Sequence, residues 1–145
     1  MTVYTAKSGM GVRARGHALV AKDGFSARYD LDRVRGVFSR PDHKLAGRSY
    51  VGHVLVLDAA KGGVATAWML HEMAARGMAP AALVLNRVNP IMVQGAALAE
   101  FTMISGFEHD ITAVVPDGAL VEVDPTGKPP ILRVLSVPAA TDAPE

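Results

Sequence analysis

Two short apolar runs with a helix-like segment between them constrain the fold of this chain more than any other feature. One run ends the segment SYVGHVLVLD (49–58), and the other lies in PAALVLN (80–86). Unbroken runs of leucine and β-branched residues are typical of strands buried on both faces. A strand, a helix and a second strand in this order form a parallel unit with a right-handed crossover.

The segment from Val64 to Arg76 is predicted to be the connecting helix. Glu72 and Arg76 have the spacing of a supportive helical ion pair, and Gly77 follows at the position of a C-terminal cap. At about 100° per residue, the opposite and apolar face comprises Ala67, Leu70, Met73 and Ala74.

The rest of the chain adds strands and one further helix. GHALVAK (16–22) is predicted to be a strand, and residues 24–47 a long loop with a short strand near Phe25. Residues 89–103 have a helical pattern, with Pro90 in the first turn. The segments ALVEVD (119–124) and PILRVL (130–135) are predicted to pair around the turn PTGK.

This order predicts an α/β fold with a mixed sheet or a partly closed barrel and flanking helices. The length of 145 residues suits one domain, and 50% hydrophobic residues allow a substantial core. We expect a single domain over residues 1–135. The Pro- and Ala-rich residues 136–145 are expected to be a flexible tail.

Composition excludes several classes of function. The formal net charge of +1 gives no electrostatic argument for nucleic-acid binding. The absence of cysteine excludes disulfides, thiolate nucleophiles and cysteine-bound clusters within this chain. No apolar run reaches the roughly 18 residues of a membrane span. These features suit a cytoplasmic protein, and the apolar content also allows a homo-oligomer.

Lys61-Gly62-Gly63 lies between the first buried strand and the helix, where a loop can bind an anion. Backbone N–H groups and the positive helix end would face a phosphate or carboxylate, Lys61 would add charge, and Thr66 would add a hydroxyl. The triplet matches neither the Walker pattern nor GxGxxG. The alternative is a tight turn in which the glycines only permit positive φ.

Other polar groups have competing interpretations. Asp42, His43 and Lys44 follow a proline turn and could orient a proton-transfer group, although a solvated turn explains them better. Asn86 and Asn89 flank the junction between the second buried strand and the next helix. Their amides could bind a substrate carboxylate, while Asn89 could equally be a helix N-cap. The remaining histidines show no metal-binding spacing, so no metal site is expected.

Taken together, four stretches resemble the small, swivelling domain of the aconitase X family. They are GHALVAKDGFSARYDLD near the start, RPDHKLAGRSYVGHVLVL (40–57), the glycine loop with its helix (61–77), and APAALVLNRVNPIMVQGAALAE (79–100). The last is the most specific, because it joins a strand, an asparagine-rich junction with a proline, and a helix of small residues. The likeness covers roughly residues 9 to 135.

The resemblance implies a swivelling β/β/α domain docked on a larger catalytic subunit, which would carry an iron–sulfur cluster or a metal. This chain would hold no cofactor itself. The family's reactions are dehydrations of small hydroxy acids, such as cis-3-hydroxyproline or mevalonate 5-phosphate. The resemblance further implies that the glycine loop binds the substrate and supplies a serine as the base that removes the proton next to the carboxylate.

The glycine loop departs from the family pattern at the position of that base. The family loop is approximately Pro-Ser-Gly-Arg-Gly-Ser-Ser, and without gaps it falls on residues 58–64. Lys61 then replaces the arginine and keeps its charge. The two final serines fall on Gly63 and Val64, neither of which can transfer a proton. Thr66 is the nearby hydroxyl that could substitute.

Three interpretations of the function therefore remain. The first is a small subunit of an aconitase X-like hydro-lyase that binds a small carboxylate substrate through Lys61, Gly62, Gly63, Asn86 and Asn89, with Thr66 as the base. The second is a catalytically silent or repurposed accessory subunit of another multi-subunit enzyme, such as a decarboxylase. A self-associating ligand-binding module is a third, weaker interpretation.

Overall fold

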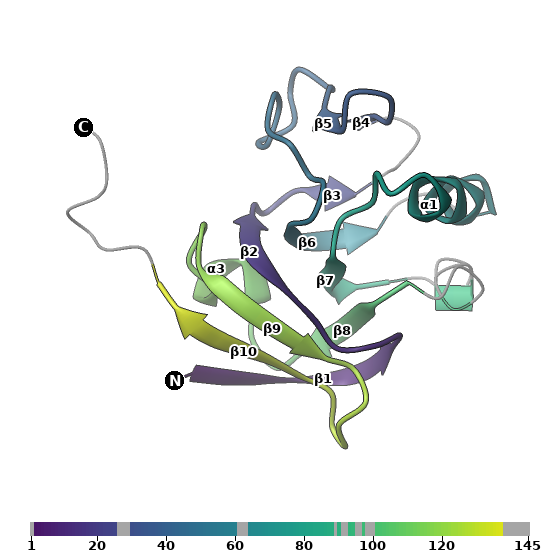
Figure 1. Ribbon diagram of the computed structural model, residues 1–145. Helices are drawn as coiled ribbons and strands as arrows, with labels where there is room; N and C mark the ends of the chain where they lie inside the picture. Colours follow the sequence, from purple (N-terminus) through teal and green to yellow (C-terminus); the bar gives the residue numbers. More distant parts are fainter. Residues whose placement is uncertain are drawn as a thin grey trace, which may run out of the picture.

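The computed structural model of the chain describes most of its backbone (Figure 1). The described residues are 2–25, 30–60, 64–88, 90, 93, 94, 97 and 101–137. In chain order, the elements are β1 (Thr2–Met10), β2 (Ala14–Val20), β3 (Gly24–Phe25), β4 (Leu31–Asp32), β5 (Val37–Phe38), β6 (Val54–Ala60), α1 (Val64–Ala75), β7 (Ala82–Arg87), β8 (Met103–Phe107), α3 (Ile111–Val114), β9 (Leu120–Asp124) and β10 (Ile131–Ser136).

A mixed sheet closes on itself to form the body of the molecule. In the described part of the chain, the strand order is β2-β9-β10-β1-β8-β7-β6-β3, and an additional pairing of β2 with β6 closes the ring. Strands β2, β6, β7 and β8 are parallel to their neighbours in this group, whereas β1, β9 and β10 pair antiparallel. The predicted α/β class with a partly closed barrel is confirmed.

Strands β1 and β2 each pair with different neighbours along the two halves of their length. The first half of β1, from Thr2 to Thr5, pairs with β10, and the half from Ala6 to Met10 pairs with β8. Strand β2 likewise pairs with β9 through Ala14–His17 and with β6 through Ala18–Val20. Strands β1 and β2 therefore each pair with two different neighbours along their length. Among the described strands, these pairings leave no exposed strand edge at either place where the barrel closes.

Strands β6 and β7 are buried on both faces, as their apolar runs predict. Val54 and Val56 of β6 face a cluster inside the barrel, and Leu55 and Leu57 face a second cluster on the outer side. All four side chains are fully buried. Each such burial contributes about 1.5–3 kcal/mol of transfer free energy, so these strands form the centre of the core.

Helix α1 lies on the outer cluster through Met73, which is fully buried. Its end matches the prediction, since Gly77 has φ +70°. The N–H of Met78 donates to the carbonyl of Met73 (2.9 Å) and the N–H of Gly77 donates to that of Ala74 (3.2 Å), which is a Schellman cap. The ion pair between Glu72 and Arg76 is also present at 3.8 Å.

One residue of the predicted buried face of α1 lies elsewhere. Ala74 is exposed, because the helix packs through Met69 and Met73, four residues apart, and Ala74 is rotated away from that line. The side chains of Ala67 and Leu70 lie outside the described residues.

Two predicted segments differ from the structure at their ends. Residues 50–53 form a turn, with φ +75° at Gly52, so β6 begins at Val54 and not near residue 49. The helix predicted to reach residue 103 stops earlier, because Phe101 and Thr102 are not helical and Met103 opens β8. That strand inserts between β1 and β7, a pairing that no local pattern reveals.

The long loop predicted over residues 24–47 carries three two-residue strands, β3 near Phe25 as expected and the small ladder of β4 with β5. It covers the outer cluster with buried side chains, namely Leu31, Phe38 and Leu45. Strand β10 ends at Ser136, and residues 138–145 of the predicted tail lie outside the described residues. Among the described residues, no helix has the length and hydrophobicity of a membrane span.

Tyr50 provides a test of the packing in the outer cluster. Its side chain is fully buried, and its hydroxyl has no hydrogen-bond partner within the described part of the chain. Burial raises the pKa of this phenol. A buried hydroxyl without a partner costs about 1–3 kcal/mol, so we expect Tyr50→Phe to leave the free energy of unfolding unchanged or to raise it by about 1 kcal/mol.

Tyr4→Phe is the matched control for urea unfolding at neutral pH. The Tyr4 hydroxyl donates to the carbonyl of Val114 at 3.3 Å, so its loss should lower the free energy of unfolding by about 0.5–1.5 kcal/mol. A loss in Tyr50→Phe as large as that in Tyr4→Phe would show that the Tyr50 hydroxyl has a stabilising partner.

Candidate functional site

The parallel strands bring their carboxyl ends to one edge of the barrel, and polar residues gather there. Lys22 and Asp23 follow β2, Asp58 lies near the end of β6, Asn86 lies near the end of β7, and Asp110 follows β8. In α/β sheets with parallel strands, ligands bind at this edge. The edge is therefore the candidate functional site.

Asn86 joins three elements at this edge. Its Nδ2 donates to Asp58 Oδ1 at 3.0 Å and to Asp110 Oδ1 at 2.7 Å, and its Oδ1 accepts the N–H of Ile111 at 2.8 Å. One amide thus connects β6, β7 and the first residue of α3. Both of its donors and its acceptor are engaged within the chain.

Asp110 is the N-cap of α3 and the more strongly hydrogen-bonded of the two carboxylates. Its Oδ1 accepts from the hydroxyl of Thr112 at 2.6 Å and from the N–H of Thr112 at 3.0 Å. Lys22 Nζ lies 3.2 Å from its Oδ2. The Thr112 hydroxyl, followed by the Asn86 amide, holds the pKa of Asp110 well below its ordinary value.

Asp58 is held in a similar way on the neighbouring strand. Arg87 Nη2 donates to its Oδ2 at 2.9 Å, and Asn86 takes the other oxygen. The Asn86 amide first, and then Arg87, lower the pKa of the Asp58 carboxyl. Both carboxylates therefore stay ionised at neutral pH and are weak bases, so they suit a role in holding the edge more than one in taking a proton.

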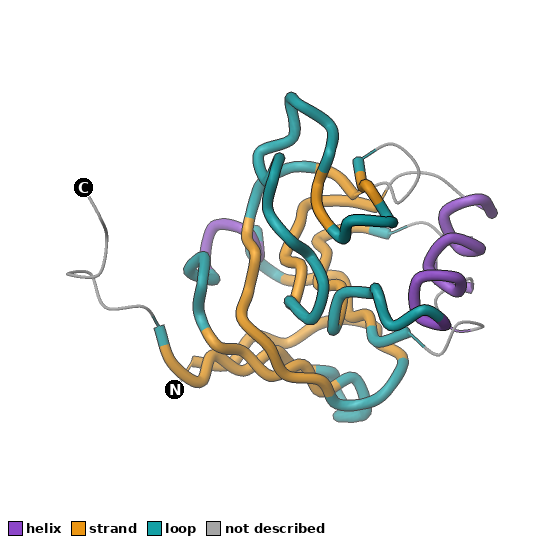
Figure 2. Tube along the Cα trace, turned by 45° about the horizontal axis from the view of Figure 1, so that its top comes forward, coloured by secondary structure: helices purple, strands orange, loops and turns teal. Residues whose placement is uncertain are grey.

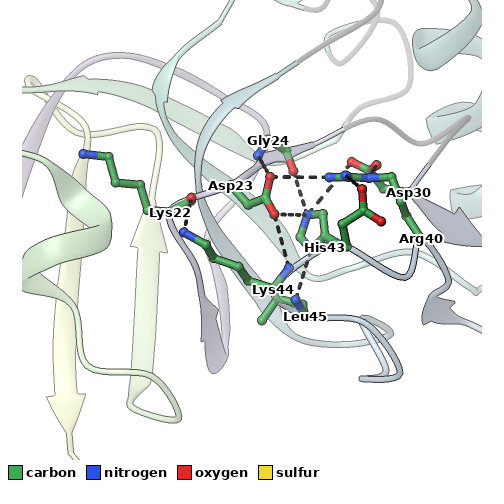
Figure 3. A network of polar contacts seen from close by, with 9 residues as sticks. Lys22, Asp23, Gly24, Asp30, Arg40, His43, Lys44 and Leu45 are labelled. Carbon is green, nitrogen blue, oxygen red and sulfur yellow. Dashed lines mark hydrogen bonds and ion pairs between the residues drawn. The ribbon is translucent and has the colours of Figure 1, made fainter.

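A second polar network anchors the long loop beside this edge (Figure 3). Asp23 accepts the N–H of Gly24 at 2.8 Å and that of Lys44 at 3.2 Å, and Arg40 reaches it at 3.4 Å. Burial alone would raise the pKa of Asp23, but the two backbone donors together with the neighbouring charges lower it. The backbone oxygen of Asp23 accepts the N–H of Asp58 at 2.9 Å, which connects the two networks.

His43 is a structural member of this second network. The N–H of Leu45 donates to its Nδ1 at 3.0 Å, so Nε2 carries the proton and donates to the carbonyl of Gly24 at 2.9 Å. Its ring is buried and stacks on Phe38 with centroids 4.6 Å apart. The prediction of a solvated turn is confirmed for Asp42, whose side chain is 83% exposed, and is wrong for His43, which is buried. Both ring nitrogens are engaged, so His43 is not placed for proton transfer.

Comparison with known proteins identifies the domain. The profile of the aconitase X swivel domain matches residues 3–130. The chain belongs to the aconitase X swivel-domain family. The family resemblance inferred from the sequence is thereby confirmed.

Relatives and a solved structure agree with this assignment. The phosphomevalonate dehydratase small subunit of Methanocella arvoryzae is 32% identical over 116 residues, which cover 80% of this chain and 88% of that protein. The protein of the same name from Methanopyrus kandleri is 34% identical over 110 residues, covering 76% and 82%. The crystal structure of Thermococcus kodakaraensis aconitase X in its holo-form has a TM-score of 0.83 over 94% of this chain and 100% of that chain at 20% identity, which shows the shared fold.

The swivel domain places one predicted substrate-binding residue, Asn86, at the centre of the edge network. A direct contact of its amide with substrate would require exchange of one of the three hydrogen bonds, and this role stays a prediction. Thr66 is the third residue of α1, but its side chain lies outside the described residues. Lys61, Gly62, Gly63 and Asn89 also lie outside them.

Sequence reasoning missed Asp110 and Lys22 as members of the edge. Asp110 does carry a local signal, since aspartate is one of the residues preferred at a helix N-cap. Lys22 carries none, because its pairing with Asp110 depends on the closure of β2 onto β6.

The described residues offer no evident site for the iron–sulfur cluster or metal that the family resemblance implies. The sequence contains no cysteine. In the described part of the chain, no group of three or more histidine, aspartate or glutamate side chains converges in a metal-binding arrangement. The carboxylates at the edge are instead bonded to Asn86, Arg87 and Lys22.

The edge network predicts an acid-dependent stability. Asp58 and Asp110 have lowered pKa values in the folded chain, so they add stability above their unfolded pKa of about 3.9. That stability disappears as the pH falls through the folded pKa values. Asn86→Ala should lower the free energy of unfolding at pH 7 by about 2–3 kcal/mol. The difference in the free energy of unfolding between Asn86→Ala and the wild type should become smaller as the pH falls from about 5 to 2.

Urea unfolding across this pH range measures both effects. Arg87→Ala is the control, because the Arg87 side chain is 73% exposed and loss of such an ion pair costs less than about 1 kcal/mol. Parallel pH curves for wild type and Asn86→Ala would show that Asn86 does not set the pKa of either carboxylate.

Proposed function

We propose that this chain is the small subunit of a two-component hydro-lyase that dehydrates a small hydroxy acid. The observation that carries the proposal is the match to curated dehydratase small subunits over most of the length of both chains. Those relatives are named for phosphomevalonate. A phosphorylated hydroxy acid of that kind is therefore the substrate to test first.

In this proposal the glycine loop binds the anionic part of the substrate. Lys61 supplies a positive charge, and the N–H groups of Gly62 and Gly63 supply donors next to the N-terminus of α1. The 12-residue helix starts at Val64, so its positive end lies directly after the loop. The amide of Asn89 provides a further donor for the substrate carboxylate, and that of Asn86 does so if it exchanges one of its hydrogen bonds to Asp58 or Asp110.

The reaction removes a proton from the carbon next to the carboxylate, while the hydroxyl on the neighbouring carbon leaves. The electrons of the C–H bond form the new double bond, and the proton and hydroxide together make one water. Because Gly63 and Val64 occupy the positions of the family serines, we assign the proton-accepting hydroxyl to Thr66. Such a general base contributes about 10²–10⁴-fold to the rate.

The two polar networks fix the position of the end of β6, from which the glycine loop continues along the chain. Asp58 lies three residues before Lys61, and it is held by Asn86 and Arg87 through its side chain and by Asp23 through its backbone. Catalytic groups need positions fixed to within a fraction of an ångström. The rigid end of β6 supports such positioning.

The remaining chemistry belongs to a larger subunit. We infer that any iron–sulfur cluster is held there, because this chain has no cysteine to bind one. The small subunit alone is then inactive, and activity requires the assembled pair.

Purification of the tagged chain from its own cells, with mass spectrometry and iron analysis, tests the proposal. A larger subunit that copurifies with iron, and dehydration of phosphomevalonate by the pair, is the expected result. An iron-free partner of another enzyme class, such as a decarboxylase, would show that the domain has been recruited as an accessory subunit.

Variants of the loop and helix test the assignment of the base. Thr66→Ala should lower kcat of the assembled pair by about 100-fold or more with little change in KM. Thr66→Ser keeps the hydroxyl and should retain most of the activity. Full activity in Thr66→Ala would show that the base comes from the partner.

Lys61 is expected to contribute to substrate binding and not to the rate of the chemical step. Lys61→Ala should raise KM while complex formation remains intact, and Lys61→Arg should preserve the charge and most of the affinity. Equal kinetics for wild type and Lys61→Ala would exclude Lys61 as a substrate ligand.

A further inference from the structure

Helix α1 exposes its largest apolar side chain to solvent. Trp68 is 68% exposed, although Met69 and Met73 on the same helix pack against the outer cluster. Its ring contacts only the edge of a neighbour on the described helix surface, His71, with centroids 6.2 Å apart. Tryptophan is depleted from free surfaces and enriched at the centres of protein interfaces.

The turn between β4 and β5 borders the surface around Trp68. Val34 lies in the turn between β4 and β5 and is 78% exposed. The neighbouring Arg33 lines the same hollow as Trp68, together with Met69, His71 and Glu72. The exposed surface therefore spans α1 and the β4–β5 turn, and we call these residues, Val34 included, the Trp68 surface.

Ion pairs and hydrogen bonds hold the two elements of the Trp68 surface together. Arg33 Nη1 lies 3.1 Å from Glu72 Oε1, and Arg76 Nη2 donates to the backbone oxygen of Arg33 at 3.3 Å. Trp68 thus sits on a helix that is fixed to the turn before any partner binds. A surface ordered in advance loses less entropy on association.

We propose that the Trp68 surface docks on the larger catalytic subunit and inserts Trp68 into an apolar pocket of that subunit. The inference rests on the proposed function, in which the site is shared between two chains. Trp68 lies about 6 Å along the axis from Val64, the first residue after the glycine loop. A partner that brings its reacting group to that loop must also cover the start of α1.

The composition of the Trp68 surface suits this partner. Its apolar side chains are bordered by Arg33, Glu72 and Arg76, which are partly exposed charges. An apolar centre with a charged rim is the arrangement of a specific interface. A tight seal beside the loop would also exclude water from the shared site, which strengthens the electrostatic contacts there.

Trp68→Glu, assayed with the larger subunit that copurifies with the wild type, tests the proposal. We expect its Kd for that subunit to rise by at least about 30-fold, as for an interface hot spot, with an unchanged circular dichroism spectrum. Val34→Glu should weaken binding in the same direction. Val137→Glu is the matched control, because Val137 is 58% exposed and follows β10, which ends on the opposite side of the molecule from α1 (Figures 1 and 2).

The outcomes separate the two inferences. If the wild-type pair forms and dehydrates its substrate but Trp68→Glu binds with unchanged Kd, the docking surface is wrong and the proposed function stands. If light scattering shows that the isolated wild type self-associates and that Trp68→Glu only dissociates those copies, the surface is a contact between identical chains. If no larger subunit binds the wild type, the proposed function itself fails.

Discussion

The parallel pairing of β2 with β6 is the contact on which the rest of the structure depends. It aligns Ala18, Leu19 and Val20 with Val54, Leu55 and Val56, and it turns an open mixed sheet into a closed barrel. It also sets the carboxyl ends of the two strands side by side. Lys22 and Asp23 can then reach Asp110 and Asp58, which are far away in the sequence. The barrel and the polar edge are therefore consequences of the same pairing.

The parts of the fold that the sequence predicts are those where burial is local and complete. Residues 54–57 and 82–85 are apolar at every position, and the reason is visible in the structure, since alternate side chains enter different clusters. Strand β1 escaped prediction because five of its nine residues are exposed and only Ala6 is buried. Pairing with β8 and β10 stabilises it. Strand β8 follows a segment of helical pattern without a break that could mark its start.

The same reasoning explains what could be predicted of the site. The position of Asn86 at the end of a buried strand predicted an amide that could bind substrate there, and β7 ends one residue later, at Arg87. Its partner Asp110 lies 24 residues later, and only the fold brings the two together. His43 looked like part of a solvated turn because Asp42 and Lys44 beside it are polar. Its burial depends on Phe38 and Gly24, which sequence spacing does not connect to it.

The two faces of β6 and β7 contribute to different parts of the molecule. On β6, Asp58 lies on the same face as Val54 and Val56, which point into the barrel interior. On β7, Asn86 likewise lies on the same face as Ala82 and Val84. Ile111 of α3 closes that interior core. The leucines of the opposite register pack with Met73 of α1 in the outer cluster. The edge network is therefore an extension of the barrel framework, and its presence does not by itself imply a reaction.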